Sequence, residues 1–108
     1  MTIHVTDVAI VGGGMVGGAL ALGLAQQGFT VTVLEKAAPP AFDPASAPDV
    51  RISAISAASV GLLKSLGVWD AIRAMRVHAY RRLETWEWES AHVAFDAAEL
   101  KLPELRSE

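Results

Sequence analysis

The apolar positions in the first third of the chain form two short runs on either side of a longer segment. Residues 8–11 are nearly continuous in β-branched side chains, which is typical of a strand buried on both faces of a parallel sheet. Residues 15–27 are rich in leucine and alanine and end at Gly28, which predicts a helix. Residues 30–34 form the second run. The pattern predicts a strand, a helix and a strand within about 30 residues.

Glycines gather where the first strand should turn into the helix. Gly12, Gly14 and Gly17 have the spacing G-x-G-x-x-G, and Gly13 lies between the first two. The first glycine permits a tight turn, the second lets the backbone approach a pyrophosphate, and the third lets the helix pack close to the strand. The amino-terminal end of the helix offers N–H groups and partial positive charge to that anion.

The second strand ends in an acidic residue. Glu35 follows the glycines by about 20 positions, as a dinucleotide-binding unit requires, and Lys36 comes next. Glu35 is expected to accept hydrogen bonds from the adenosine ribose hydroxyls and to repel a 2′-phosphate. The alternative interpretation is that the glycines form only a tight turn and that Glu35 is a solvated charge at the end of the strand. The two strands, the glycine spacing, the helix and the acidic residue together favour an adenine dinucleotide site. Gly13 and Lys36 are also predicted to be cofactor-binding residues.

The middle of the chain is less regular. Residues 37–49 contain four prolines and predict a loop, so no strong third parallel strand follows the second one. A helix is expected from about Ser56 to a stop at Gly67, and a short helix at residues 68–72. Trp69 is expected to be a packing residue rather than a ligand contact.

The last third of the chain predicts a β-hairpin. Residues 83–89 alternate like a strand, residues 90–91 form a turn, and residues 92–95 return. This arrangement places Trp86 and Trp88 on one face. The pair is expected either to pack across the strands or to face another part of a larger protein.

Composition limits the classes of protein. With 108 residues, 52% of them hydrophobic, the chain suits one globular domain rather than a disordered chain. A net charge of −3 without a basic run argues against a nucleic-acid surface. The absence of cysteine excludes disulfides and thiolate catalysis. No segment has the pattern of a signal peptide or the length of about 20 apolar residues that a membrane span needs, so a cytoplasmic protein is expected.

No catalytic group is evident from residue types alone. His4, His78 and His92 are single and lack the spacing of metal ligands, so no metal site is expected. The serines lack the glycine-flanked turn of an activated nucleophile. Any chemistry would therefore come from a cofactor.

Three stretches resemble the start of the FAD-dependent ubiquinone-biosynthesis hydroxylases: residues 12–18 with Glu35, residues 49–56 and residues 66–69. Two more resemble most closely the branch of that family that acts on a polyprenylated methoxy-benzoquinol: residues 80–89 and 95–100. The resemblance covers about residues 7–103. The glycine motif is shared by many flavoproteins, whereas the tryptophan-rich hairpin is far more specific.

The resemblance implies an α/β fold, with a Rossmann-like FAD-binding βαβ unit followed by helices and a β-hairpin. It also implies a flavin monooxygenase, in which NAD(P)H reduces FAD and oxygen provides a hydroxyl group for a polyprenylated benzoquinol. The three motif glycines would contact the pyrophosphate and Glu35 the ribose. Arg51 would reach the FAD, where a guanidinium suits a diphosphate. The alternative role of Arg51 is a surface charge beside Asp49.

Members of this family are several times longer than this chain and carry two further FAD motifs that it lacks. Residues 1–108 are therefore expected to be the N-terminal part of an FAD-binding domain, incomplete relative to the family and inactive alone. The family also suggests a ubiquinone-biosynthesis complex as partner and a position peripheral to the inner membrane. Two other hypotheses stand beside this one. They are a nicotinamide-binding oxidoreductase fragment, which Arg51 and the proline-rich loop disfavour, and a non-catalytic truncated remnant.

Overall fold

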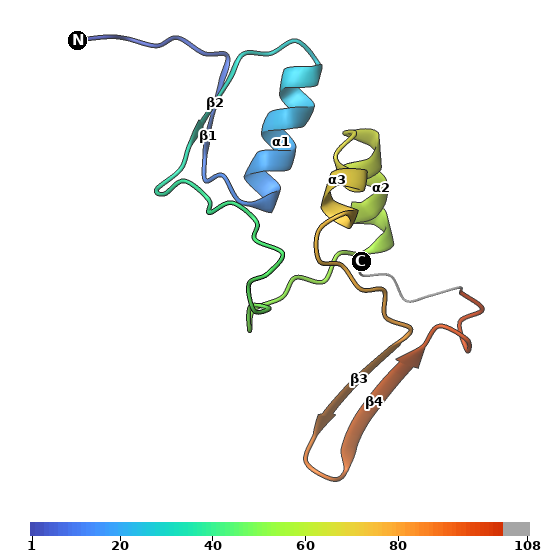
Figure 1. Ribbon diagram of the computed structural model, residues 1–108. Helices are drawn as coiled ribbons and strands as arrows, with labels where there is room; N and C mark the ends of the chain where they lie inside the picture. The colour runs from blue at the N-terminus through green and yellow to red at the C-terminus, as the bar shows by residue number, and fades with distance from the viewer. Residues whose placement is uncertain (103–108) are drawn as a thin grey trace. The chain divides into compact units, whose positions relative to one another are not determined.

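The computed structural model describes residues 1–102 (Figure 1). Residues 103–108, where the family resemblance ends, lie outside the described part. The chain divides into two compact units, residues 1–42 and the residues from 43 onward. The first unit contains β1 (Val8–Val11), α1 (Met15–Gln26) and β2 (Val31–Leu34). The second unit contains α2 (Ala57–Ser65), α3 (Trp69–Arg73), β3 (Arg82–Glu87) and β4 (Ala91–Asp96).

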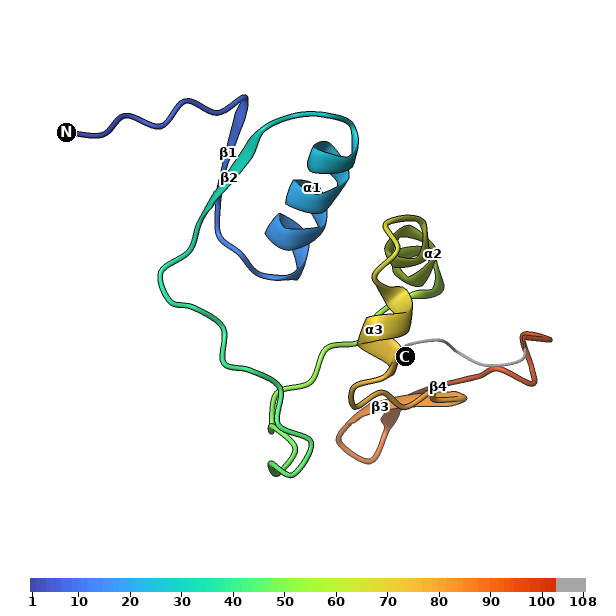
Figure 2. The ribbon, with the colours of Figure 1, turned by 45° about the horizontal axis from the view of Figure 1, so that its top comes forward.

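The first unit is the predicted βαβ motif. β1 and β2 pair in parallel, in register from Val8 opposite Val31 to Val11 opposite Leu34. α1 connects the two strands and packs on one face of the pair (Figures 1 and 2). The predicted order of strand, helix and strand is confirmed, and the helix ends at Gln26, one residue before the predicted end.

Burial in this motif is one-sided. Ile10 is the buried residue of β1, whereas its neighbour Val11 is 86% exposed. The β-branched run predicts burial on both faces, and that prediction is wrong for the part of the first unit that the structure describes. The physical reason is that α1 packs on one face of the pair, while residues 1–42 provide no second layer for the other.

Asp7 and Thr30 tie together the starts of the two strands. Thr30 donates to Asp7 Oδ2 from its main-chain N–H at 2.8 Å and from its hydroxyl at 2.9 Å. The Asp7 N–H donates in return to the carbonyl oxygen of Thr30 at 3.1 Å. The Thr30 N–H and, to a smaller extent, the hydroxyl lower the pKa of Asp7. The ionised carboxylate therefore stabilises this end of the strand pair.

The helices α2 and α3 lie close to the positions that the sequence predicts. Ser56 caps α2, because its Oγ accepts a hydrogen bond from the Ser59 N–H at 3.3 Å. The helix stops before Gly67, whose φ of +81° favours glycine. Val60 of α2 and Trp69 of α3 are almost completely buried. The predicted start near Ser56, the stop at Gly67 and the packing role of Trp69 are confirmed.

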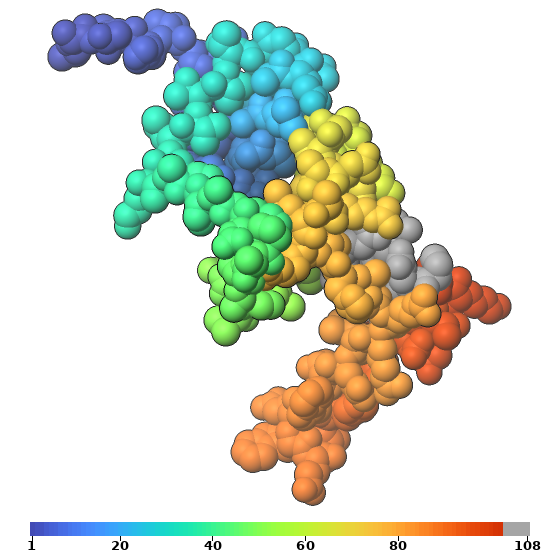
Figure 3. Space-filling view, in the orientation of Figure 1, coloured from blue at the N-terminus to red at the C-terminus, as the bar shows by residue number. Residues whose placement is uncertain are grey.

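β3 and β4 form the predicted hairpin, antiparallel and in register from Arg82 opposite Asp96. Trp88 lies in its turn, with a φ of 57°. The prediction that Trp86 and Trp88 share one strand face is therefore wrong, since the strand alternation ends at Glu87. The two tryptophan residues are 71% and 84% exposed, and the hairpin that carries them is drawn in orange in Figure 3.

We predict that Trp69→Ala lowers the free energy of unfolding by about 3 kcal/mol, because it removes an enclosed indole and leaves a cavity. Trp86→Ala is the matched control, since its indole is mostly exposed, and it should change that free energy by less than about 0.5 kcal/mol. Urea unfolding followed by far-UV circular dichroism measures both variants. Equal effects of the two substitutions would contradict the described burial.

We also predict that the contact between Asp7 and Thr30 is lost in acid. Because the folded-state pKa of Asp7 is lowered, the contact stabilises the fold above the ordinary aspartate pKa. That contribution disappears as the pH falls through the lowered folded value. Urea unfolding of the wild type and of Asp7→Asn from about pH 7 to pH 2 measures it. The wild type should be more stable at neutral pH, and a difference that stays constant into acid would be evidence against the contact.

Candidate dinucleotide-binding site

The glycine loop joins β1 to α1 at the edge of the sheet where both parallel strands end. Gly12 has a φ of +101°, a conformation that side chains with a Cβ rarely adopt. A Cβ on Gly17 would collide with the carbonyl oxygen of Gly12 and would lie 3.4 Å from Ile10 Cγ2. The backbone itself therefore requires glycine at these two positions, for the turn and for the close approach of α1 to β1.

Gly14 opens the helix and leaves space in front of it. A Cβ on Gly14 would meet no atom within 4 Å. α1 has neither a side-chain cap nor an acidic residue in its first turn, and its first main-chain bond runs from the Gly18 N–H to the Gly14 carbonyl at 2.8 Å. The N–H groups of the first turn therefore face an open, positively polarised cradle, which fits a diphosphate.

Glu35 follows β2 and reaches back to the glycine loop. Its Oε2 accepts a hydrogen bond from the Gly13 N–H. Its Oε1 accepts from the Lys36 N–H at 2.9 Å and from the Ala37 N–H at 3.5 Å. These bonds lower the pKa of Glu35, the one from Gly13 most and those from Ala37 and Lys36 less. The side chain is exposed and ionised at neutral pH, so it can also accept hydrogen bonds from a ribose.

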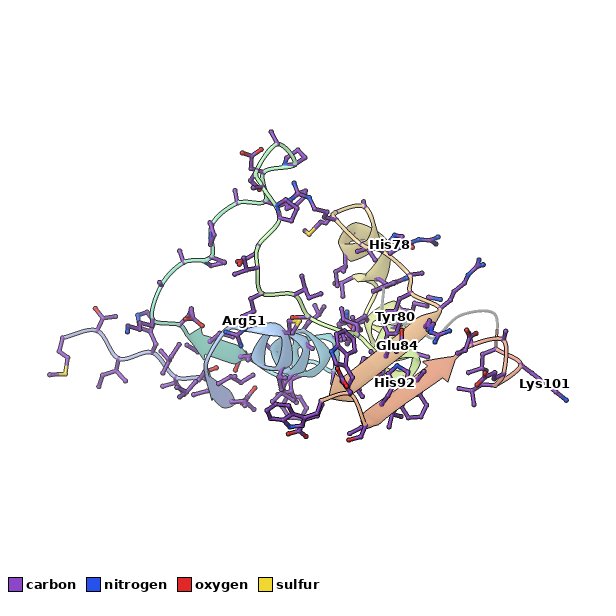
Figure 4. All side chains as sticks on the ribbon, turned by 90° about the horizontal axis from the view of Figure 1, so that it is seen from below. Arg51, His78, Tyr80, Glu84, His92 and Lys101 are labelled. Carbon is purple, nitrogen blue, oxygen red and sulfur yellow. The ribbon has the colours of Figure 1, made fainter. Side chains whose placement is uncertain are left out.

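The structure brings together six of the seven predicted cofactor-binding residues in the first unit: Gly12, Gly13, Gly14, Gly17, Glu35 and Lys36. The Lys36 N–H donates to Glu35 Oε1, and the Lys36 side chain is exposed. Arg51 belongs to the second unit, in the irregular segment before α2 (Figure 4). Its N–H donates to Asp49 Oδ1 at 3.1 Å, and its side chain is exposed. The role of Arg51 toward FAD stays a prediction.

The contact between Gly13 and Glu35 is the feature of this site that sequence reasoning misses. The motif leaves the position of Gly13 open to other residues, so the motif predicts no role for it. A fourth glycine, between the first two glycines of the motif, was the available signal, and a Cβ there would lie 3.1 Å from Glu35 Oε2. Residue 13 is therefore small where the carboxylate comes close.

The hairpin carries a separate cluster of charged side chains (Figure 4). Glu84 Oε1 lies 3.1 Å from a guanidinium nitrogen of Arg82 and 2.7 Å from Nε2 of His92. Arg82 and, after it, His92 lower the pKa of Glu84. His92 is exposed. Within residues 1–102, no three histidine, aspartate or glutamate side chains are grouped so that they could hold a metal ion.

An open hollow of about 780 Å³ lies at the hairpin turn, lined by Trp86, Trp88, Glu89 and Ser90. All of its lining comes from one short stretch of chain, and it is in the unit that does not contain the glycine loop. The lining of this hollow therefore contains none of the predicted cofactor-binding residues. Among the described residues, no helix is both long enough and apolar enough to span a membrane.

Comparisons with known proteins agree with the geometry of the loop. The profile of the family described as FAD binding domain matches residues 5–105. The 3-demethoxyubiquinol 3-hydroxylase of Escherichia coli is 77% identical over 103 residues, which are 95% of this chain and 26% of that protein. The ubiquinone hydroxylase UbiL of Rhodospirillum rubrum is 47% identical over 63% of this chain and 16% of its own length. The human ubiquinone biosynthesis monooxygenase COQ6 is 36% identical over 88% of this chain and 22% of its own length.

The chain thus spans about a quarter or less of the length of these relatives. The family profile, by contrast, covers nearly all of the chain, including the glycine loop and the segment that contains Glu35. The chain therefore belongs to the FAD-binding domain family.

Proposed function

We propose that this chain is the part of a flavin-dependent aromatic hydroxylase that binds the ADP half of FAD. The observation that carries the proposal is the joint position of the glycine loop and Glu35 at one edge of the parallel strand pair. The loop supplies main-chain donors for a diphosphate, and the carboxylate supplies an acceptor for a ribose hydroxyl beside it.

Each part of the loop has a distinct role in this proposal. The first turn of α1, open in front of Gly14, donates N–H groups to the diphosphate. Gly12 and Gly17 shape the turn, and Glu35 orients the adenosine. Arg51 is the proposed contact on the flavin side, by resemblance to the family. Bound FAD, reduced by NAD(P)H, would supply the oxygen chemistry, and the described residues of this chain bind and orient it.

The proposed substrate is a polyprenylated benzoquinol of ubiquinone biosynthesis. The names of the relatives support it, since they are a demethoxyubiquinol hydroxylase, a ubiquinone hydroxylase and a ubiquinone biosynthesis monooxygenase. The same resemblance supports membership of a ubiquinone-biosynthesis complex and a place peripheral to the inner membrane, where a polyprenyl chain would be found.

Hydroxylation is proposed for a protein in which this chain forms the N-terminal part of the FAD-binding domain, since the relatives are about four times as long. The chain alone is proposed to be inactive, because it contributes the ADP side of the cofactor site. A nicotinamide-binding oxidoreductase would use the same loop, so the choice between the two cofactors needs a direct experiment.

A chimera tests the proposal. We expect that replacing the matching 103 residues of the Escherichia coli relative with those of this chain gives a yellow protein with stoichiometric FAD, which hydroxylates demethoxyubiquinol. Flavin absorbance, chromatography of the released cofactor and product analysis measure this. A folded chimera that lacks flavin, or that binds NAD tightly in its place, would contradict the proposed function.

The open space at Gly14 generates a second prediction. Gly14→Val in the chimera should reduce FAD content at least about tenfold, because a branched side chain would occupy the diphosphate position. Gly18→Ala is the matched control. A Cβ there would meet no atom within 4 Å, and alanine favours the helix by about 1 kcal/mol, so full FAD content is expected. If Gly14→Val retains the same FAD content as the control, the loop is only a turn.

A further inference from the structure

The Glu35 side chain bridges two segments that are 22 residues apart in sequence. Its Oε2 accepts from the Gly13 N–H in the loop, while its Oε1 accepts from the N–H groups of Lys36 and Ala37 directly after β2. Each of these donors belongs to the main chain, so the pattern depends on the carboxylate and not on neighbouring side chains. One ionised group thereby joins the end of β2 to the middle of the glycine loop.

The number of acceptor positions shows how much of this carboxylate the protein itself uses. An ionised carboxylate offers about four lone-pair positions. Three main-chain donors occupy most of them, which leaves about one position, on Oε2, for an external hydroxyl. In the described structure, most acceptor positions of Glu35 therefore bind the backbone, and fewer remain for a ribose.

We infer that Glu35 is a positioning residue for the glycine loop, which holds Gly13 in place before any dinucleotide binds. This role is additional to the ribose contact, and its consequence for cofactor affinity rests on the proposed function. Since bonds to a charged acceptor are roughly twice as strong as neutral ones, the ionised carboxylate is well suited to fix a loop that contains three consecutive glycines. A preformed loop loses less conformational entropy when its ligand arrives.

The contact between Gly13 and Glu35 also depends on the absence of a side chain at residue 13. A Cβ on Gly13 would lie 3.1 Å from Glu35 Oε2 and 3.4 Å from both Glu35 Cβ and Val33 Cγ1. At these distances the carboxylate would have to move by about a few tenths of an ångström, away from the N–H that it accepts from. Gly13→Ala should therefore act through Glu35, whereas a simple turn would tolerate alanine.

Amide hydrogen exchange of the ligand-free, ¹⁵N-labelled chain tests the inference without any cofactor. In Glu35→Ala the Gly13 amide should exchange at least about tenfold faster, because its acceptor is gone. The Gly12 amide is the internal control, since it donates to the Leu34 carbonyl at 2.8 Å, and its rate should stay within about twofold. An unchanged Gly13 rate, or equal acceleration at both amides, would overturn the inference.

A double-mutant cycle on ADP affinity provides the second test. Gly13→Ala should weaken ADP binding about threefold in the wild-type background and have no effect in Glu35→Ala, because the group that it displaces is missing there. Gly18→Ala, which touches nothing, is the control in both backgrounds. Additive effects would overturn the inference. Failure of ADP to bind the wild-type chain would instead refute the proposed function, and the exchange experiment would still decide the role of Glu35.

Discussion

In a parallel strand pair, both strands end at the same edge of the sheet, and this geometry creates the site. β1 delivers the glycine loop to that edge and β2 delivers Glu35, so two segments 22 residues apart come into hydrogen-bonding contact. Asp7 and Thr30 are hydrogen-bonded at the opposite end of the strand pair, and four residue pairs of β1 and β2 lie between the two contacts. The contact between Asp7 and Thr30 helps to fix the register of the strands. A slip of one residue would separate the Glu35 carboxylate from the Gly13 N–H.

The loop has two separate sets of main-chain donors. The N–H of Gly13 is given to the Glu35 carboxylate, which is part of the protein. The N–H groups of the first turn of α1 have no side-chain cap and face open space in front of Gly14. In the proposed function, a diphosphate binds at the helix terminus without displacing Glu35, because each of the two anions then has main-chain donors of its own.

Much of the fold could be predicted because the signals are local. Gly12 and Gly67 have the positive φ values that a turn and a helix stop require, and Ser56 caps α2 as its position indicates. The position of Trp88 could not be predicted, because the alternation of tryptophan and glutamate in the sequence continues into a turn, where the backbone is no longer extended. The contact between Gly13 and Glu35 depends on tertiary proximity, which no pattern in either segment specifies.

The glycine loop is proposed to bind the diphosphate of an adenine dinucleotide. Titration of the ¹⁵N-labelled chain with ADP, followed through the amide chemical shifts, measures this binding residue by residue. We predict saturable shifts that are largest from Gly12 through Val16 and at Glu35, and smaller shifts, at the loop alone, with inorganic phosphate. Shifts confined to the hairpin around Trp86 and Trp88, or none at the loop, would contradict it.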